Sequence, residues 1–142
     1  MKFKVYRLAE PQDGNGIPLY LCPVSAGFPC PTDEYVEDEI DLNRILIQNP
    51  EATFLLEVCG ESMVDAHLYN GDRLIVDTSL EAAPNNIVIA TISGEFTVKR
   101  LIKKRGRFYL KPENEKYNEI DITDDETVEI RGVVTYIIHK AR

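Results

Sequence analysis

The stretch "NIVIATISGEFTVKRLIKK", residues 86–104, decides the fold class. It holds two runs rich in β-branched and aromatic residues, separated by Ser93-Gly94, a dipeptide suited to a tight hairpin turn. Similar runs, bounded by Asn, Gly, Asp and Pro, recur on both sides of it: "TFLLEV", "DRLIVD", "RFYLKP" and "TVEIRGVVTYII". From residue 53 onward the pattern therefore predicts a mainly β domain in which neighbouring strands pair as hairpins.

The first part of the chain has a different composition. Residues 1–31 include "EPQDGNGIPLYLCPVSAGFPCP", which is rich in Pro and Gly and shows no helical period. Such a segment is typical of a mobile or extended arm. We therefore divide the chain into an N-terminal arm, residues 1–31, and a β domain, residues 32–142.

A short helical segment is expected where the arm meets the β domain. In "TDEYVEDEIDLNRILIQNP" either Thr32 or Asp33 can serve as an N-cap, and a break near Asp41 can cap a second turn. The apolar residues of that second turn are Leu42, Ile45 and Leu46. Pro50 then ends the segment, so we expect one or two short helices.

Length and composition limit the class of protein. A chain of 142 residues has the size of one domain, and its 44% hydrophobic and 28% charged residues are those of a soluble globular protein. No apolar run approaches the roughly 18 residues of a membrane span, and "MKFKVYRLAEP" lacks the apolar stretch of a secretory signal. We expect no membrane association and a cytoplasmic location.

The charge of the chain is acidic overall and uneven along its length. A net charge of -8 argues against nonspecific binding of nucleic acid, which needs clustered Lys and Arg. Acidic residues concentrate in residues 27–57 and 113–129, and basic residues in 95–112. We interpret these blocks first as solvated faces, and second as surfaces for another protein or a second copy of this chain.

Neither the cysteines nor the histidines indicate a metal site or a cofactor. The three cysteines, Cys22, Cys30 and Cys59, form no C-x-x-C pair and favour neither a disulfide framework nor a zinc site. The two histidines, His67 and His139, lie far apart in the sequence. The glycines form no phosphate-binding loop. We therefore expect no cofactor and no metal.

Two residues carry candidate chemistry: Ser62 in "VCGESMVDA" and Lys99 in "GEFTVKRL". A serine nucleophile needs a base, and no turn would fold the nearby His67 onto Ser62, whereas a neutral lysine is the base of Ser-Lys dyads. Strand alternation places Lys99 beside Thr97 and Leu101 on one face, where burial would lower its pKa from about 10.4 toward 7 or 8. By themselves, however, the two patterns favour an ordinary turn serine and a surface lysine.

The two segments indicate a function more strongly together than either does alone. "GESMVDAHLYNGDRLIVD" followed by "GEFTVKRL" resembles the LexA/UmuD family of self-cleaving serine peptidases, and its UmuD-like branch in particular. The similarity covers most of the chain, and its motifs are G-x-S-M, Gly-Asp before a strand, and E-F-T-V-K. The resemblance implies a strand-rich core of the LexA/signal-peptidase-like, β-clip type, with one or two short helices and a flexible N-terminal arm.

The resemblance also assigns roles to residues. Ser62 corresponds to the nucleophile and Lys99 to the general base, so high pH should promote the reaction. The backbone N–H groups of Glu61 and Ser62 correspond to the oxyanion hole, so the Glu61 carboxylate is not used. The family cuts its own chain before the core, and "SAGFP" supplies the matching bond, Ala26-Gly27, within the expected arm.

The partners follow from the same resemblance. In the family, a RecA filament on single-stranded DNA stimulates self-cleavage during the SOS response to DNA damage. The trimmed UmuD-like form is a homodimer and an accessory subunit of an error-prone translesion polymerase, with a UmuC-type Y-family polymerase as catalytic partner. Residues 1–26 hold no helix-turn-helix pattern, so we expect no direct specific DNA binding. A polymerase-binding regulatory module with vestigial peptidase activity remains the alternative.

Overall fold

The computed structural model describes most of the chain, namely residues 2–7, 17–20, 36–59, 68–112 and 118–141. Its contacts divide the chain into two units, which are described separately. One unit comprises Met1–Leu8 and Asn49–Arg142, and the other comprises Ala9–Gln48. The helices of the described residues are short, and none is long and apolar enough to cross a bilayer.

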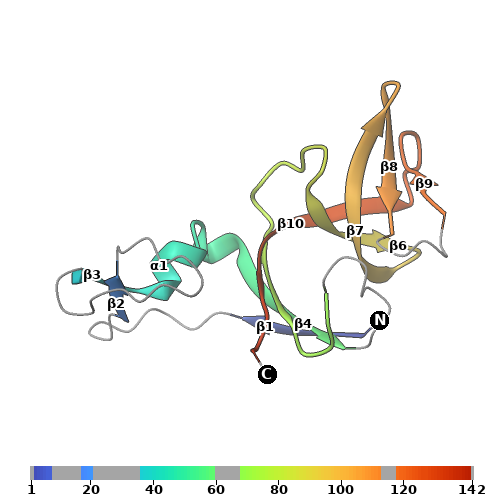
Figure 1. The fold of residues 1–142 in the computed structure, drawn as a ribbon. Helices are drawn as coiled ribbons and strands as arrows, with labels where there is room; N and C mark the ends of the chain where they lie inside the picture. Colours follow the sequence, from blue (N-terminus) through green and yellow to red (C-terminus); the bar gives the residue numbers. More distant parts are fainter. Residues whose placement is uncertain (1, 8–16, 21–35, 60–67, 113–117, 142) are drawn as a thin grey trace. The chain divides into compact units, whose positions relative to one another are not determined.

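The larger unit is built on an eight-stranded sheet in the order β1-β4-β5-β10-β6-β7-β8-β9, with every neighbouring pair antiparallel (Figure 1). Its strands are β1 (Lys2–Arg7), β4 (Thr53–Cys59), β5 (Arg73–Asp77), β6 (Ile87–Ile92), β7 (Glu95–Lys104), β8 (Arg107–Lys111), β9 (Ile120–Asp121) and β10 (Val128–Ile138). Each run of β-branched and aromatic residues in the sequence has become a strand. The prediction of a mainly β fold is therefore confirmed.

Two-residue turns connect β6 to β7 and β7 to β8. The first turn is the predicted one, and its residues Ser93 and Gly94 have φ values of 51° and 80°. In the second turn Arg105 and Gly106 have φ values of 51° and 77°. Positive φ at both positions is the type I′ geometry, whose twist suits antiparallel strands. The three strands therefore lie side by side in sequence order, and β7 and β8 reach the top of Figure 1.

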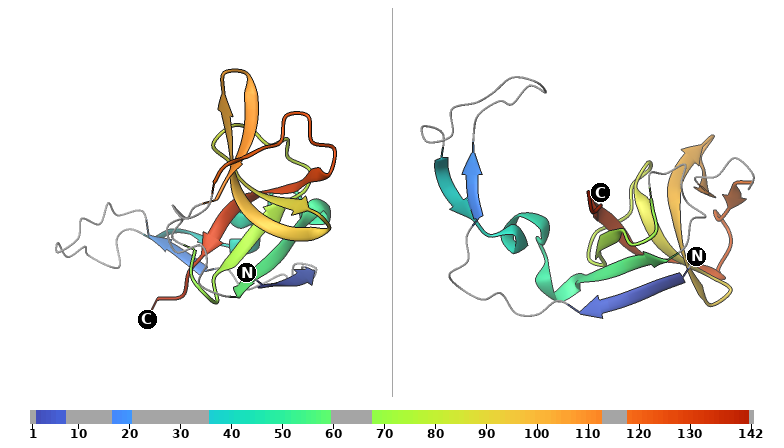
Figure 2. Two further views of the ribbon diagram at one scale, coloured as in Figure 1. Left: turned by 90° about the vertical axis from the view of Figure 1, so that its right-hand side faces the viewer. Right: turned by 60° about the horizontal axis from the view of Figure 1, so that its bottom comes forward.

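Strand β1 differs from the expected arm. Lys2–Arg7 pairs with β4 along its whole length, and the Tyr6 hydroxyl donates a hydrogen bond of 3.1 Å to the Glu57 carboxylate. Figure 2 shows the two strands side by side. The alternating basic and apolar residues of "KFKVYR" have the period of two that a strand needs. By its contacts, Lys2–Arg7 thus belongs to the same unit as the strands from Thr53 onward.

The described residues of the smaller unit form a two-stranded sheet and a helix. Strand β2 (Ile17–Tyr20) pairs antiparallel with β3 (Val36–Ile40), and α1 (Leu42–Leu46) follows. The predicted helical turn after Asp41 is confirmed, because its carboxylate caps the helix by accepting a hydrogen bond of 2.9 Å from the Asn43 N–H.

Of the one or two expected helices, an earlier one running on from Thr32 or Asp33 is wrong over Val36–Ile40, which is a strand. As a helix this segment, "VEDEI", would place three consecutive acidic residues in one turn with little apolar surface to bury. Pairing with β2 satisfies its backbone groups instead. The expected caps Thr32 and Asp33 lie outside the described residues. Pro50 ends no helix directly but begins a short 3-10 turn, Pro50–Ala52, that leads into β4.

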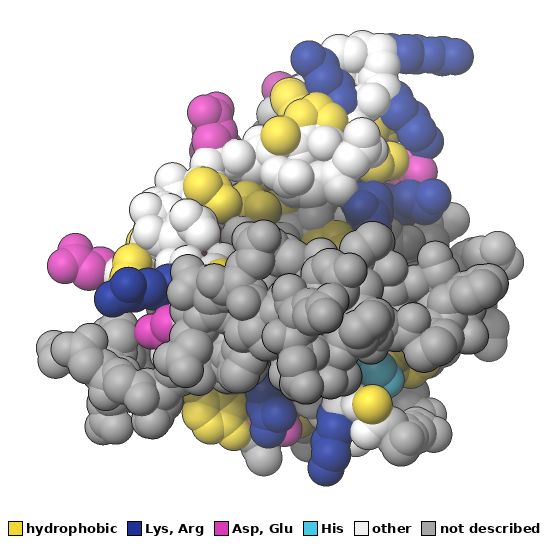
Figure 3. All heavy atoms as spheres, turned by 60° about the vertical axis from the view of Figure 1, so that its left-hand side comes forward, with side chains coloured by type: hydrophobic (Ala, Val, Ile, Leu, Met, Phe, Trp, Pro, Cys, Tyr) yellow, Lys and Arg dark blue, Asp and Glu magenta, His cyan; other side chains and the backbone are white. Residues whose placement is uncertain are grey.

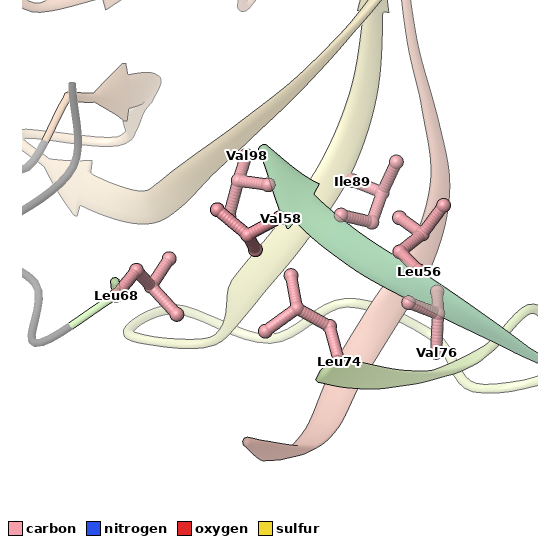
Figure 4. Packing of buried hydrophobic residues seen from close by; sticks show 7 residues of the cluster. All are labelled: Leu56, Val58, Leu68, Leu74, Val76, Ile89 and Val98. Atoms are coloured by element: carbon pink, nitrogen blue, oxygen red, sulfur yellow. The ribbon is translucent and has the colours of Figure 1, made fainter. Parts of the chain in front are cut away.

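The core of the larger unit consists of two clusters of buried side chains. Figure 4 shows the first cluster, whose side chains from β4, β5, β6, β7 and the Leu68 segment point toward one another. Its members are Leu56, Val58, Leu68, Leu74, Val76, Ile89 and Val98. The second cluster comprises Val88, Ala90, Leu101, Leu110 and Val133. Because Val88 and Ile89 are neighbours on β6 but belong to different clusters, the clusters lie on opposite faces of the β6–β7 ladder.

The basic block of the sequence lies mainly on the β7–β8 hairpin. Lys and Arg side chains gather at the upper end of the face drawn in Figure 3, over the tip of this hairpin. Acidic residues of the 113–129 block form ion pairs with these basic side chains. Lys104 pairs with Glu119 at 2.9 Å, and Arg107 pairs with Asp121 at 2.7 Å and with Asp124 at 3.4 Å. These two charge blocks therefore compensate each other in part.

Candidate active site

Lys99 lies in the middle of β7, a strand that carries buried residues on both faces, Val98 on one and Leu101 on the other. It stands opposite Val88 of β6 in the antiparallel register, and cross-strand partners point to the same face of a sheet. Val88 is fully buried, and so is Leu101, two residues along the strand. The predicted grouping of Lys99 with Thr97 and Leu101 on one face therefore agrees with the structure.

Burial lowers the pKa of the Lys99 ammonium below its usual 10.5. The cause is desolvation, because the apolar second cluster removes water from around the charged form. No described carboxylate opposes this shift. A larger fraction of Lys99 is thus neutral at a given pH than of a solvated lysine, and only a neutral amine can accept a proton.

The segment that carries Ser62 begins after β4 and ends before Leu68. Ser62 and Glu61 lie outside the described residues, but both ends of their segment are well fixed. Val58 and Leu68 pack with Val98, the chain neighbour of Lys99, in the first cluster. The ends are thus anchored to the strand that carries Lys99.

Val98 and Lys99, however, point to opposite faces of β7. The intervening chain is long enough to bridge the two faces, because residues 60–67 could span up to about 26 Å when extended. The length of the segment therefore permits Ser62 to approach Lys99.

Several other residues singled out in the sequence also lie outside the described residues. These are Ala26 and Gly27 of the expected cleavage site, together with Cys22, Cys30 and His67. Cys59 is among the described residues and lies at the end of β4, where its free thiol is half-buried. Within the described ranges no three His, Cys, Asp or Glu side chains gather so that they could hold a metal ion.

Sequence reasoning missed a buried carboxylate close to this segment. Asp72 is 1% exposed and lies 2.6 Å from the imidazole of His139, measured between Oδ1 and Nδ1. The ring of His139 also contacts Tyr69 at 5.2 Å between centroids. The sequence did single out Asp72, as part of the Gly-Asp motif before a strand. Its contact with His139 could not be predicted, because no periodic pattern links two residues that lie 67 positions apart.

Comparison with known proteins places the chain in one family. Residues 18–135 match the family described as peptidase S24-like. The chain is 42% identical over 137 residues to protein MucA of Escherichia coli, covering 96% of this chain and 93% of MucA. It is 43% identical over 139 residues to protein ImpA of Shigella flexneri, covering 96% of this chain and 94% of ImpA.

A LexA repressor is a more distant relative. The chain is 36% identical over 133 residues to the LexA repressor of Histophilus somni, which covers 91% of this chain but 61% of the repressor. The likeness therefore extends across the β core and leaves part of the repressor unmatched. Together with the family match, these relatives show that the chain belongs to the peptidase S24-like family, as a UmuD-like member of the LexA/UmuD group of self-cleaving peptidases.

Proposed function

We propose that the chain is a serine peptidase that cuts itself between Ala26 and Gly27 by means of a Ser62-Lys99 dyad. The observation that carries the proposal is the lysine of β7, whose side chain is half-buried against Val88 and Leu101 and whose pKa is lowered for that reason. A lysine in that state is the base that a serine without a histidine partner requires.

The reaction follows from the roles of these groups. The neutral Nζ of Lys99 takes the proton of the Ser62 hydroxyl, and the oxygen attacks the carbonyl carbon of Ala26. The N–H groups of Glu61 and Ser62 stabilise the oxyanion that forms, a contribution of a few kcal/mol. The amine of Gly27 leaves with the proton that Lys99 carries, and water then releases Ala26 from the serine. A base of this kind contributes about 10²- to 10⁴-fold to the rate.

Regulation is part of the proposal. A RecA filament on single-stranded DNA would stimulate the cut during the SOS response, and the trimmed chain would serve, as a homodimer, as accessory subunit of a UmuC-type translesion polymerase. The likeness to MucA, ImpA and a LexA repressor supports this assignment. The trigger and the polymerase both act on DNA inside the cell, so the proposal places the chain in the cytoplasm.

Intact mass measurement of the purified chain tests the peptidase. At alkaline pH, or with RecA, ATP and single-stranded DNA, we expect loss of residues 1–26. Ser62→Ala and Lys99→Ala should abolish the cut, whereas Lys103→Ala, an exposed lysine of the same strand, should cut as fast as wild type.

Other outcomes discriminate between parts of the proposal. Cutting at alkaline pH without any response to RecA would remove the trigger and keep the dyad. A chain that stays intact under every condition, and in DNA-damaged cells, would favour the regulatory module without peptidase activity. Unchanged cutting by Ser62→Ala or Lys99→Ala would refute the dyad itself.

A further inference from the structure

The contact between the buried Asp72 and the partly exposed His139 ties the residue after β10 to the turn that follows the Ser62 segment. His139 comes directly after β10, and its Nδ1 lies 2.6 Å from Oδ1 of Asp72. The Asp72 carboxylate is almost fully buried, while the His139 side chain remains 48% exposed. A buried carboxylate is costly unless its oxygens are paired, so His139 and the turn itself must satisfy it.

The second oxygen of Asp72 organises the turn. Its Oδ2 accepts a hydrogen bond of 2.9 Å from the Tyr69 N–H, and the Asp72 N–H donates one of 3.0 Å to the Tyr69 carbonyl. Gly71 has a φ of 89°, a value that residues with a side chain rarely adopt. The carboxylate therefore holds the first residue of the turn against the last.

The same turn is tied to the end of β4. The Val58 N–H donates to the Asp72 carbonyl, and the Gly71 N–H donates to the Val58 carbonyl, each at 2.8 Å. The chain leaves this point through Cys59 and returns to it through Leu68, which is fully buried. Both ends of the Ser62 segment are thus fixed to a turn whose geometry depends on Asp72.

We propose that Asp72 and His139 are positioning residues for Ser62. His139 donates to the Asp72 carboxylate and keeps it aimed at the Tyr69 N–H, and the Tyr69 ring lies against the His139 ring. The contact closes the turn, and the turn sets where the Ser62 segment starts and ends. This proposal rests on the proposed function, since it concerns the geometry of the same site.

The test compares three replacements of His139 in the full-length chain. His139→Asn keeps a side-chain N–H donor near the place of Nδ1, His139→Leu keeps the volume beside Tyr69 without a donor, and His139→Ala removes both. We expect the Leu and Ala variants to cut themselves about 10- to 100-fold more slowly, because small misplacements of reacting groups have effects of this size. The Asn variant should recover most of the rate, and the exposed neighbour Lys140→Ala should match wild type.

Hydrogen exchange of the backbone amides supplies a second readout. In the Leu variant, amides of Val58 and of residues 69–72 should exchange faster, while those of β6 and β7 keep their protection. If His139→Ala also loses protection in β6 and β7, that variant is destabilised as a whole. The positioning role is then judged from the His139→Asn and His139→Leu variants alone. Equal cutting by Asn and Leu variants, or unchanged exchange in the turn of the Leu variant, would overturn the positioning role.

The same series separates this inference from the proposed function. If Ser62→Ala is inactive while His139→Leu cuts at the wild-type rate, the positioning role fails and the dyad stands. If Ser62→Ala cuts as fast as wild type, the dyad fails, and exchange in the turn still reports whether the Asp72-His139 contact holds the segment.

Discussion

Replacing Asp77 with alanine should lower the free energy of unfolding by about 3 kcal/mol, by removing hydrogen bonds to a buried carboxylate. Asp77 ends β5 and is 3% exposed. Its Oδ2 accepts a bond of 2.8 Å from the Asn49 amide, and its Oδ1 accepts bonds from the N–H and hydroxyl of Ser79 at 2.8 and 2.6 Å. Counting one bond of about 1.5 kcal/mol for each of the two donor residues gives the estimate.

Asp125 provides a matched control. Its Oδ1 accepts the same pair of bonds from Thr127, at 2.9 Å from the N–H and 2.5 Å from the hydroxyl, but the residue is exposed. Asp125→Ala should change the stability little, because water replaces its bonds. With a urea dependence of about 2 kcal/mol per M, Asp77→Ala should lower the unfolding midpoint by about 1.5 M. The measurements belong in a Ser62→Ala background, so that self-cleavage cannot interfere.

The pH dependence of the unfolding midpoint provides a second test of the role of Asp77. Burial alone raises the pKa of Asp77, but the bonds from Asn49, Ser79 and the Leu80 N–H outweigh it and lower the pKa below its usual 3.8. The ionised form is therefore favoured in the folded state. Its contribution is fully present above pH 3.8 and is lost as the pH falls through the lowered pKa. Equal midpoint shifts for the Asp77 and Asp125 variants at pH 7 would refute the reasoning.

Two further predictions concern the sheet. Gly132→Ala should lower the free energy of unfolding by about 1–3 kcal/mol through overpacking, because the new Cβ would lie 2.7 Å from Cγ1 of the buried Val76. Arg131→Ala, at the exposed neighbouring position, should lower it less, and equal urea midpoints for the two variants would contradict this. Lys99→Met should raise the urea midpoint at pH 7, because it removes a desolvated charge. Since the pKa of Lys99 in the folded state lies below 10.5, this gain in midpoint should shrink as the pH rises through that pKa toward 10.5. A gain that is absent at pH 7, or that stays constant with pH, would count against desolvation.

Much of the sheet could be predicted from local sequence. The dipeptide Ser93-Gly94 defined a hairpin because positive φ at both turn positions restricts the residue types that fit. Asp41 was predictable as a cap because its contact reaches only two residues along the chain. Strand β1 escaped prediction, although "KFKVYR" alternates, since its Pro/Gly-rich neighbourhood suggested an arm and its partner β4 lies some 50 residues away.

The candidate site shows the same division between local and distant causes. Alternation alone placed Lys99 on a face with Leu101, but its burial depends on Val88 of β6 and on the rest of the second cluster. The pairing of Asp72 with His139 depends on β10 lying beside β5, a neighbour relation that no sequence period encodes. Contacts between distant elements decide burial and pKa, and these quantities distinguish a reactive lysine from a surface one.

The central claim, that Lys99 acts as a neutral base at Ser62, is tested most directly by the rate of self-cleavage as a function of pH. The rate should rise about tenfold per pH unit while Lys99 is protonated, and it should level off below pH 10.5, the usual pKa of a lysine. Lys99→Arg, which keeps the charge but cannot give up its proton, should remove this profile. A rate that climbs through pH 10.5 without a break, or an arginine variant that cuts like wild type, would contradict the claim.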